Sequence, residues 1–121
     1  MAKNFIAEGD DLPWTNGTGS AVVSGQVVRV GQVLGIAAVD IAVGATGVVH
    51  TCGVFTVPKV TTAVIAQGAA LLWDASAAKF DVGTATPATG DVSLAVFAWE
   101  AAGNGATTIK AHFDERIGTV A

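Results

Sequence analysis

Two side chains that can bind a metal ion, His50 and Cys52, are two positions apart in the segment "HTC". On an extended strand, residues i and i+2 point to the same face, so both could contact one ion. A third ligand would have to come from His112 or from an aspartate. The alternative, a partly buried histidine beside an inert core cysteine, is favoured. A nucleophilic Cys–His pair is less favoured still, because no third group orients the histidine. We therefore predict neither a metal site nor a catalytic site.

Paired carboxylates occur at Asp10-Asp11 and at Asp114-Glu115. Adjacent residues of an extended chain point to opposite sides, so neither pair forms an acid–base dyad by itself. The sequence contains no P-loop, no nucleophile elbow and no dinucleotide-binding fingerprint. We predict a protein that is not an enzyme and that uses no cofactor.

Charge and composition narrow the classes of partner. The formal net charge is −4, the six basic residues are scattered, and charged residues make up only 13% of the chain. A nucleic-acid surface would need clustered Lys and Arg, and no apolar run reaches the ~18 residues of a membrane span. We expect no nucleic-acid or membrane partner, synthesis in a cytosol-like environment, and a surface partly covered by copies of the same chain.

The first twenty residues differ from the rest. Residues 1–20 combine acidic residues, Pro13 and the polar segment "TNGTGS", which predicts an extended arm followed by a loop. Trp14 is either a lid on the core or an anchor in an interface, since Trp is enriched at binding hot spots. We expect residues 21–121 to form a single β-rich domain.

Short apolar and alternating segments separated by glycines predict a compact β-sandwich or barrel-like domain of antiparallel strands. Gly31-Gln32 is expected to form a type II′ turn, and Gly53 to mark a bulge. In residues 107–113 we expect Ile109, Ala111 and Phe113 to share one face. The strand at 92–100 is apolar on both faces, which is typical of a central or doubly covered strand. At most one short helix is expected, before Gly68. The strands are expected in the segments "QVVRV", "VLGIAAV", "VVHTCGVFTV", "VSLAVFAWE" and "TTIKAHF".

The segment "LLWDASAAKFDV" predicts a hairpin. One strand is expected to end at Trp73, and residues 74–77 to form the turn, with Asp74 bonded to backbone N–H groups. Ala78, Phe80 and Val82 are expected to face one way on the return strand. Trp73 then packs against the core or a neighbouring chain, which makes it a second candidate interface anchor.

Several segments, in this order, resemble the capsid-decoration (cement) proteins of tailed phages, a family long of unknown function in which some members carry a recombinase label. They are "NFIAEGD", "VVSGQVVRVGQVLGIAAVDIAVG", "GVFTVPK", "GAALLWDA" and "GATTIKAHF". The resemblance implies a β-rich structural protein that forms homotrimers on the outer surface of the phage head. It also implies contact with the major capsid protein at threefold and quasi-threefold positions. The family's capsid-binding arm carries over to Lys3, Asn4, Phe5, Ile6, Glu8 and Gly9.

An alternative function remains open from the residues alone. Trp14 and the Thr/Asn/Gly loop could belong to a virion-surface module that recognises a glycan or a host receptor.

Overall fold

The computed structural model describes residues 3–4, 6–7 and 9–121. Ten strands and no helix are found in these residues, and all strand pairs within the two sheets are antiparallel. The prediction of a compact β-sandwich or barrel-like domain is therefore confirmed. The segment before Gly68 forms turns rather than a helical piece. In the described part of the chain, no helix is long and apolar enough to span a membrane.

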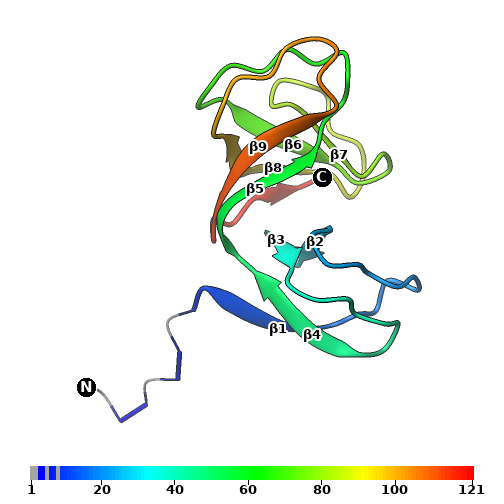
Figure 1. Ribbon diagram of the computed structural model, residues 1–121, viewed down its shortest axis with the longest axis vertical. Coiled ribbons are helices and arrows are strands. Elements are labelled where there is room, and N and C mark those ends of the chain that lie inside the picture. Colours follow the sequence, from blue (N-terminus) through cyan, green and yellow to red (C-terminus); the bar gives the residue numbers. More distant parts are fainter. Residues whose placement is uncertain (1–2, 5, 8) are drawn as a thin grey trace.

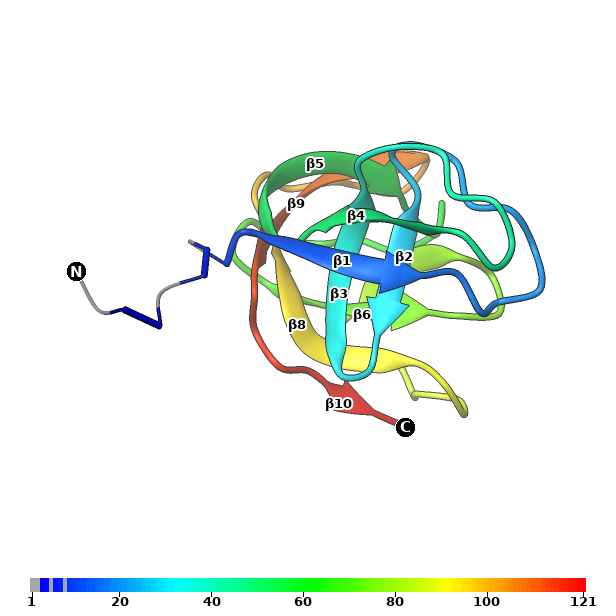
Figure 2. The same cartoon turned by 90° about the horizontal axis from the view of Figure 1, so that it is seen from below.

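The N-terminal half forms a four-stranded sheet in the order β1-β4-β3-β2. Only two residue pairs join β3 to β4, so β1 and β4 can turn steeply and cross over β2 and β3 (Figure 2). Residues 11–15, which fall in the expected arm and loop, form an integral strand of this sheet. The strands are β1 (Asp11–Thr15), β2 (Val27–Val30), β3 (Val33–Ala37) and β4 (Thr46–His50).

The C-terminal half forms a six-stranded sheet in the order β5-β9-β8-β6-β7, with β10 paired to β8. A parallel bridge between Lys59 and Phe80 brings the ends of the two outer strands, β5 and β7, together. The sheet therefore curls into a half-barrel above the first sheet (Figure 1). Its strands are β5 (Cys52–Pro58), β6 (Ala70–Asp74), β7 (Lys79–Val82), β8 (Val92–Ala98), β9 (Thr108–Asp114) and β10 (Thr119–Val120).

The β2–β3 turn agrees with the prediction from its residues, but the break in the next long segment does not. Val30 pairs with Val33, and Gly31 has a φ of 60°, as the first central residue of a type II′ turn requires. The bulge expected at Gly53 is wrong, because β5 and β9 pair without a register shift from Cys52 onward. The segment 48–57 is interrupted at Thr51 instead, where the chain leaves one sheet for the other.

The β6–β7 hairpin is confirmed, with its turn one residue later than expected. Asp74 still pairs with Lys79, so residues 75–78 form the turn, and Ala78 has a φ of 54° instead of lying on the return strand. The carboxylate of Asp74 accepts hydrogen bonds from Ser76 Oγ (2.9 Å) and from the backbone N–H of Ala77 (3.2 Å). The bond from Ser76 is the main reason that the pKa of Asp74 is lowered.

Two apolar clusters form the core, and the larger one holds the two sheets together. The larger cluster lies between the sheets and joins Val27, Leu34 and Ile36 of the first sheet to aromatic residues such as Phe80 and Phe113 of the second. The rings of Phe80 and Phe113 meet edge to face at 6.1 Å. The smaller cluster comprises Val22, Val28, Ala37, Ile41 and Val49, with Trp14 and Val30 packed against it. Both clusters draw on the first sheet, because the two faces of β2 and β3 are each covered.

Lys59 is a charged residue that is completely buried, with an exposed fraction of 0%. Its Nζ donates hydrogen bonds to the carbonyl oxygens of Val60 (2.8 Å), Gly103 (3.1 Å) and Ala106 (3.4 Å). Its backbone N–H donates to the carbonyl of Thr107 at 2.9 Å. The lysine therefore connects the end of β5 to the loop between β8 and β9. Its three ammonium N–H groups give these carbonyl oxygens the hydrogen bonds that water would otherwise supply.

The substitution Lys59→Met is expected to lower the free energy of unfolding by about 2–4 kcal/mol, because three carbonyl groups in partly buried hydrogen bonds lose their donor. The expected value is smaller than the sum over three bonds, since the variant no longer buries an ammonium group. The measurement is urea denaturation followed by circular dichroism. The matched control is Lys79→Met at an exposed position, for which a change within about 0.5 kcal/mol is expected. Equal stability of the two variants would contradict a structural role for Lys59.

Candidate functional site

The chain before β1 is the first candidate site. Figures 1 and 2 show the described residues of this arm running away from both sheets. Lys3, Asn4, Ile6 and Gly9 are all exposed, and Ile6 has an exposed fraction of 92%. Phe5 and Glu8 lie outside the described residues. An apolar side chain held this far from its own core is placed to contact another molecule.

The base of the arm is firmly attached to the body. The carbonyl oxygen of Asp10 accepts hydrogen bonds from the backbone N–H (2.9 Å) and Oγ1 (2.8 Å) of Thr51. The next residue, Asp11, begins β1, and its carboxylate is hydrogen-bonded to Nδ1 of His50. The boundary between the projecting arm and the folded sheet therefore lies between Gly9 and Asp10.

The residues of the "HTC" segment are separated by the crossing between the sheets. His50 ends β4, bonds to Asp11 and stacks on Phe55, with ring centroids 6.3 Å apart. Cys52 begins β5 and is exposed. His112 is not grouped with them; its ring stacks with Phe97 of β8 and with Trp99, just after β8.

Cys52 belongs to a different group of potential metal ligands. The ligand atoms of Asp10, Cys52 and Glu115 lie within 4.8 Å of one another, and all three residues are exposed. Exposed acidic groups are often close together without binding an ion. The addition of one solvent-exposed thiol does not make this group a preformed metal site. The cluster marks the place where the base of the arm meets the ends of β5 and β9.

The two candidate anchor tryptophans occupy different environments. Trp14 lies on β1 opposite Gly47, is half-buried, and packs against the smaller apolar cluster. Trp73 lies in the main core with an exposed fraction of 7%, and its ring is 4.9 Å from that of Phe80. Its remaining surface lines an apolar hollow of about 400 Å³ between β6, Pro58 and the start of β2. Both residues pack on their own protomer, and a role of either in an interface stays a prediction.

The polar loop after Trp14 is held by hydrogen bonds from a buried side chain, that of Asn16. Asn16 is buried, and its Nδ2 donates to the carbonyl oxygens of Ser20 (2.8 Å) and Ile41 (3.0 Å). Its Oδ1 accepts from the backbone N–H (3.0 Å) and Oγ1 (2.7 Å) of Thr18. The amide of Asn16 thus uses its hydrogen-bonding groups to shape the loop.

A group of exposed apolar residues on the half-barrel was not predicted from the sequence. We call it the aromatic strip: Val54, Leu94 and Trp99 are exposed, and the half-buried rings of Phe97 and His112 lie among them. The strand β8 is central, as expected, lying between β9 and β6, but its outer face is only partly covered in the described residues: Leu94 is exposed, and Ser93 and Phe97 are half-buried. The sequence indicated such a surface only indirectly. Both faces of residues 92–100 are apolar, which predicts that both faces are covered but does not say by what.

Geometry and burial indicate the class of protein. The described chain is a small β-strand unit with a projecting arm and a partly exposed aromatic strip, which are features of a protein that works through contacts with other molecules. A family model described as "Phage cement protein" matches residues 6–113, so the chain belongs to the phage cement protein family. The resemblance noted from the sequence is thereby confirmed. No curated protein matched the chain.

Membership of this family gives the chain a structural role on the phage capsid.

Proposed function

We propose that this chain assembles as a homotrimer that binds the major capsid protein on the outer surface of the phage head, at threefold and quasi-threefold positions. The chain is made in the host cytoplasm, acts without catalysis, and uses its arm as the capsid-binding element. The observation that carries the proposal is the exposed arm, with Ile6 almost fully accessible and the base of the arm held at Asp10 by Thr51.

The physical advantage of such an arm lies in its attachment. An extended segment can add to a sheet edge of another protein and gain main-chain hydrogen bonds, while alternate side chains give specificity. Because the base is fixed, each arm of a trimer would start from a defined position. Simultaneous binding of several arms then raises the overall affinity through the effective concentration of the remaining arms.

Two hollows in the described part of the chain fit a structural role better than a catalytic one. The hollow at the half-barrel is lined by Arg116 and otherwise by apolar or glycine residues, and the hollow beside Trp73 has no ionisable residue in its lining. Neither places an acid–base pair or a nucleophile beside its base. The alternative, recognition of a glycan or receptor through Trp14 and its loop, has less support, because Trp14 packs on its own core and Asn16 is bonded within the loop.

Purified protein added to mature, expanded shells that lack it is expected to raise the temperature at which the shells open. A ligand that binds the intact assembly and not the opened one stabilises it by mass action. The measurement is differential scanning calorimetry of shells with and without the protein, with electron microscopy to score opened particles. Shells that open at the same temperature in both samples would contradict the proposed function.

Removal of residues 1–9 is expected to leave a folded protein that binds shells at least about tenfold more weakly. The deletion stops before Asp10, because its carbonyl accepts both hydrogen bonds from Thr51. Shell binding is measured by co-sedimentation, and folding by circular dichroism.

A point variant distinguishes the contribution of one side chain to shell binding from the contribution of the whole arm. Ile6→Ser is expected to weaken binding, whereas Val64→Ser, at an exposed apolar position of the body, is the matched control and should bind normally. Normal binding by the truncated protein would show that the arm is not the anchor.

A further inference from the structure

The aromatic strip is a continuous surface across three strands of the half-barrel. Cross-strand pairing places Val54 of β5 opposite His112 of β9, and His112 opposite Phe97 of β8. The rings of Phe97 and Trp99 stack on His112, with centroid distances of 4.7 Å and 5.6 Å and interplanar angles of 26° and 17°. Because the three rings are stacked, each restricts the rotamers of its neighbours. Less side-chain entropy is then lost when a partner binds.

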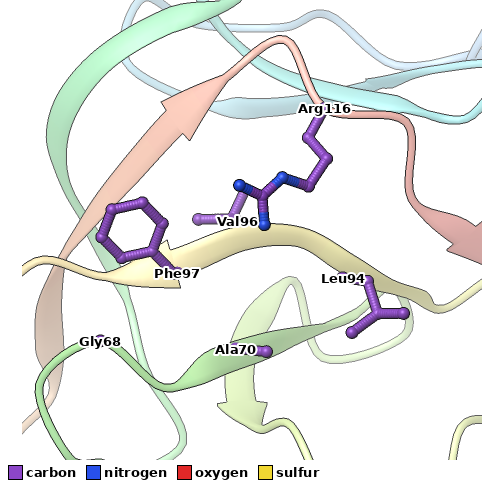
Figure 3. Close-up of a pocket in the computed structure, with 6 residues that line it drawn as sticks. All are labelled: Gly68, Ala70, Leu94, Val96, Phe97 and Arg116. Carbon is purple, nitrogen blue, oxygen red and sulfur yellow. The ribbon is translucent and has the colours of Figure 1, made fainter.

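A bulge extends the strip and creates a hollow beside it. The pairing of β6 with β8 shifts register between Ala70 and Leu72, and in this interval Leu94 has a φ of 67° and an exposed fraction of 56%. The adjoining hollow has a volume of about 330 Å³. Figure 3 shows the side chain of Arg116 lying over β8, between Phe97 and Leu94. The surface therefore combines aromatic rings, the projecting side chain of Leu94 and a hollow. Aromatic and apolar groups of this kind are enriched in the cores of protein interfaces.

Charge distinguishes this surface from the rest of the chain. Lys110 on β9 pairs with Glu100 at 3.3 Å, and Arg116 pairs with Asp114 at 3.1 Å. These four charges cancel, and the exposed Glu115 between Asp114 and Arg116 leaves this surface with a formal charge of −1 out of the chain's −4. Two copies of an acidic chain repel each other less where most charges are matched. Opposite charges at the borders can also be exchanged between copies without leaving a charge unpaired.

We propose that the aromatic strip is the surface through which one copy of this chain contacts another. The proposal rests on the trimer of the proposed function and identifies the part of the protomer that forms it. An exposed Trp beside a second ring and a projecting aliphatic side chain has the composition of an interaction hot spot. Burial between copies also accounts for a β8 strand that carries apolar residues on both faces while its outer face is only partly covered within one chain.

The test is sedimentation equilibrium of the full chain at micromolar concentration. The wild type is expected as a species of three 12.0 kDa chains. Trp99→Glu is expected to weaken self-association by about 30-fold or more and to sediment as a single chain, because it places a carboxylate in an apolar contact. Leu94→Asn is a second variant that keeps the fold, since asparagine tolerates a positive φ. It is expected to weaken self-association in the same direction.

The matched control is Val43→Glu, which introduces the same charge at an exposed valine of the four-stranded half. It should remain a trimer, and dissociation of this control to the same extent would overturn the proposal, as would a Trp99→Glu protein that stays trimeric. A strip that binds soluble saccharides through Trp99 while the trimer is unchanged by both strip variants would also overturn it.

The two proposals fail in different ways. A wild-type protein that is monomeric in solution overturns the strip as a self-interface, while shell calorimetry still decides whether the protein stabilises capsids. A trimer that is disrupted by Trp99→Glu, together with shells that open at an unchanged temperature, supports the strip and contradicts the proposed function.

Discussion

The crossing of the chain at Thr51 is the constraint on which the rest of the structure depends. Thr51 alone separates β4 from β5, and it is buried. Its N–H and Oγ1 both donate to the carbonyl of Asp10, and its own carbonyl accepts from the N–H of Glu115 at 2.9 Å. Buried backbone groups must be paired, so the crossing requires the base of the arm and the end of β9 to lie at this point. Three segments that are distant in sequence are thereby held together.

The same crossing allows two small sheets to share one core. Val27, Leu34 and Ile36 of the first sheet pack with residues of the half-barrel because β4 and β5 carry the chain directly from one layer to the other. A second connection reinforces the first. Gln32, in the β2–β3 turn, accepts a hydrogen bond from the N–H of Gly118 at 2.8 Å. A Cβ at Gly118 would lie only 2.6 Å from Val92, so the close approach of this segment to β8 requires glycine.

Two candidate surfaces follow from this arrangement, and they differ in physical character. The described residues of the arm project from the body and are exposed, so they are available to a partner. The aromatic strip contains stacked rings, has an ion pair at each of two borders, and lies on strands that the core holds in place. In our proposals the arm contacts the shell and the strip contacts other copies of the chain. One chain could supply both contacts because the arm and the half-barrel meet at Asp10 and Glu115.

The sequence by itself determined the mainly β class, the turn at Gly31, the presence of the β6–β7 hairpin though not the exact position of its turn, the inward face of β9, and the family. These depend on local chemistry and on the order of short segments, which can be seen without the fold. Only the tertiary structure decided that Asp11–Thr15 is a strand, that the chain breaks at Thr51 rather than at Gly53, and that Trp99 stacks on His112. Each of these rests on contacts between residues far apart in the chain. Strand pairing and burial are set by such contacts, and local sequence patterns do not record which partner fills them.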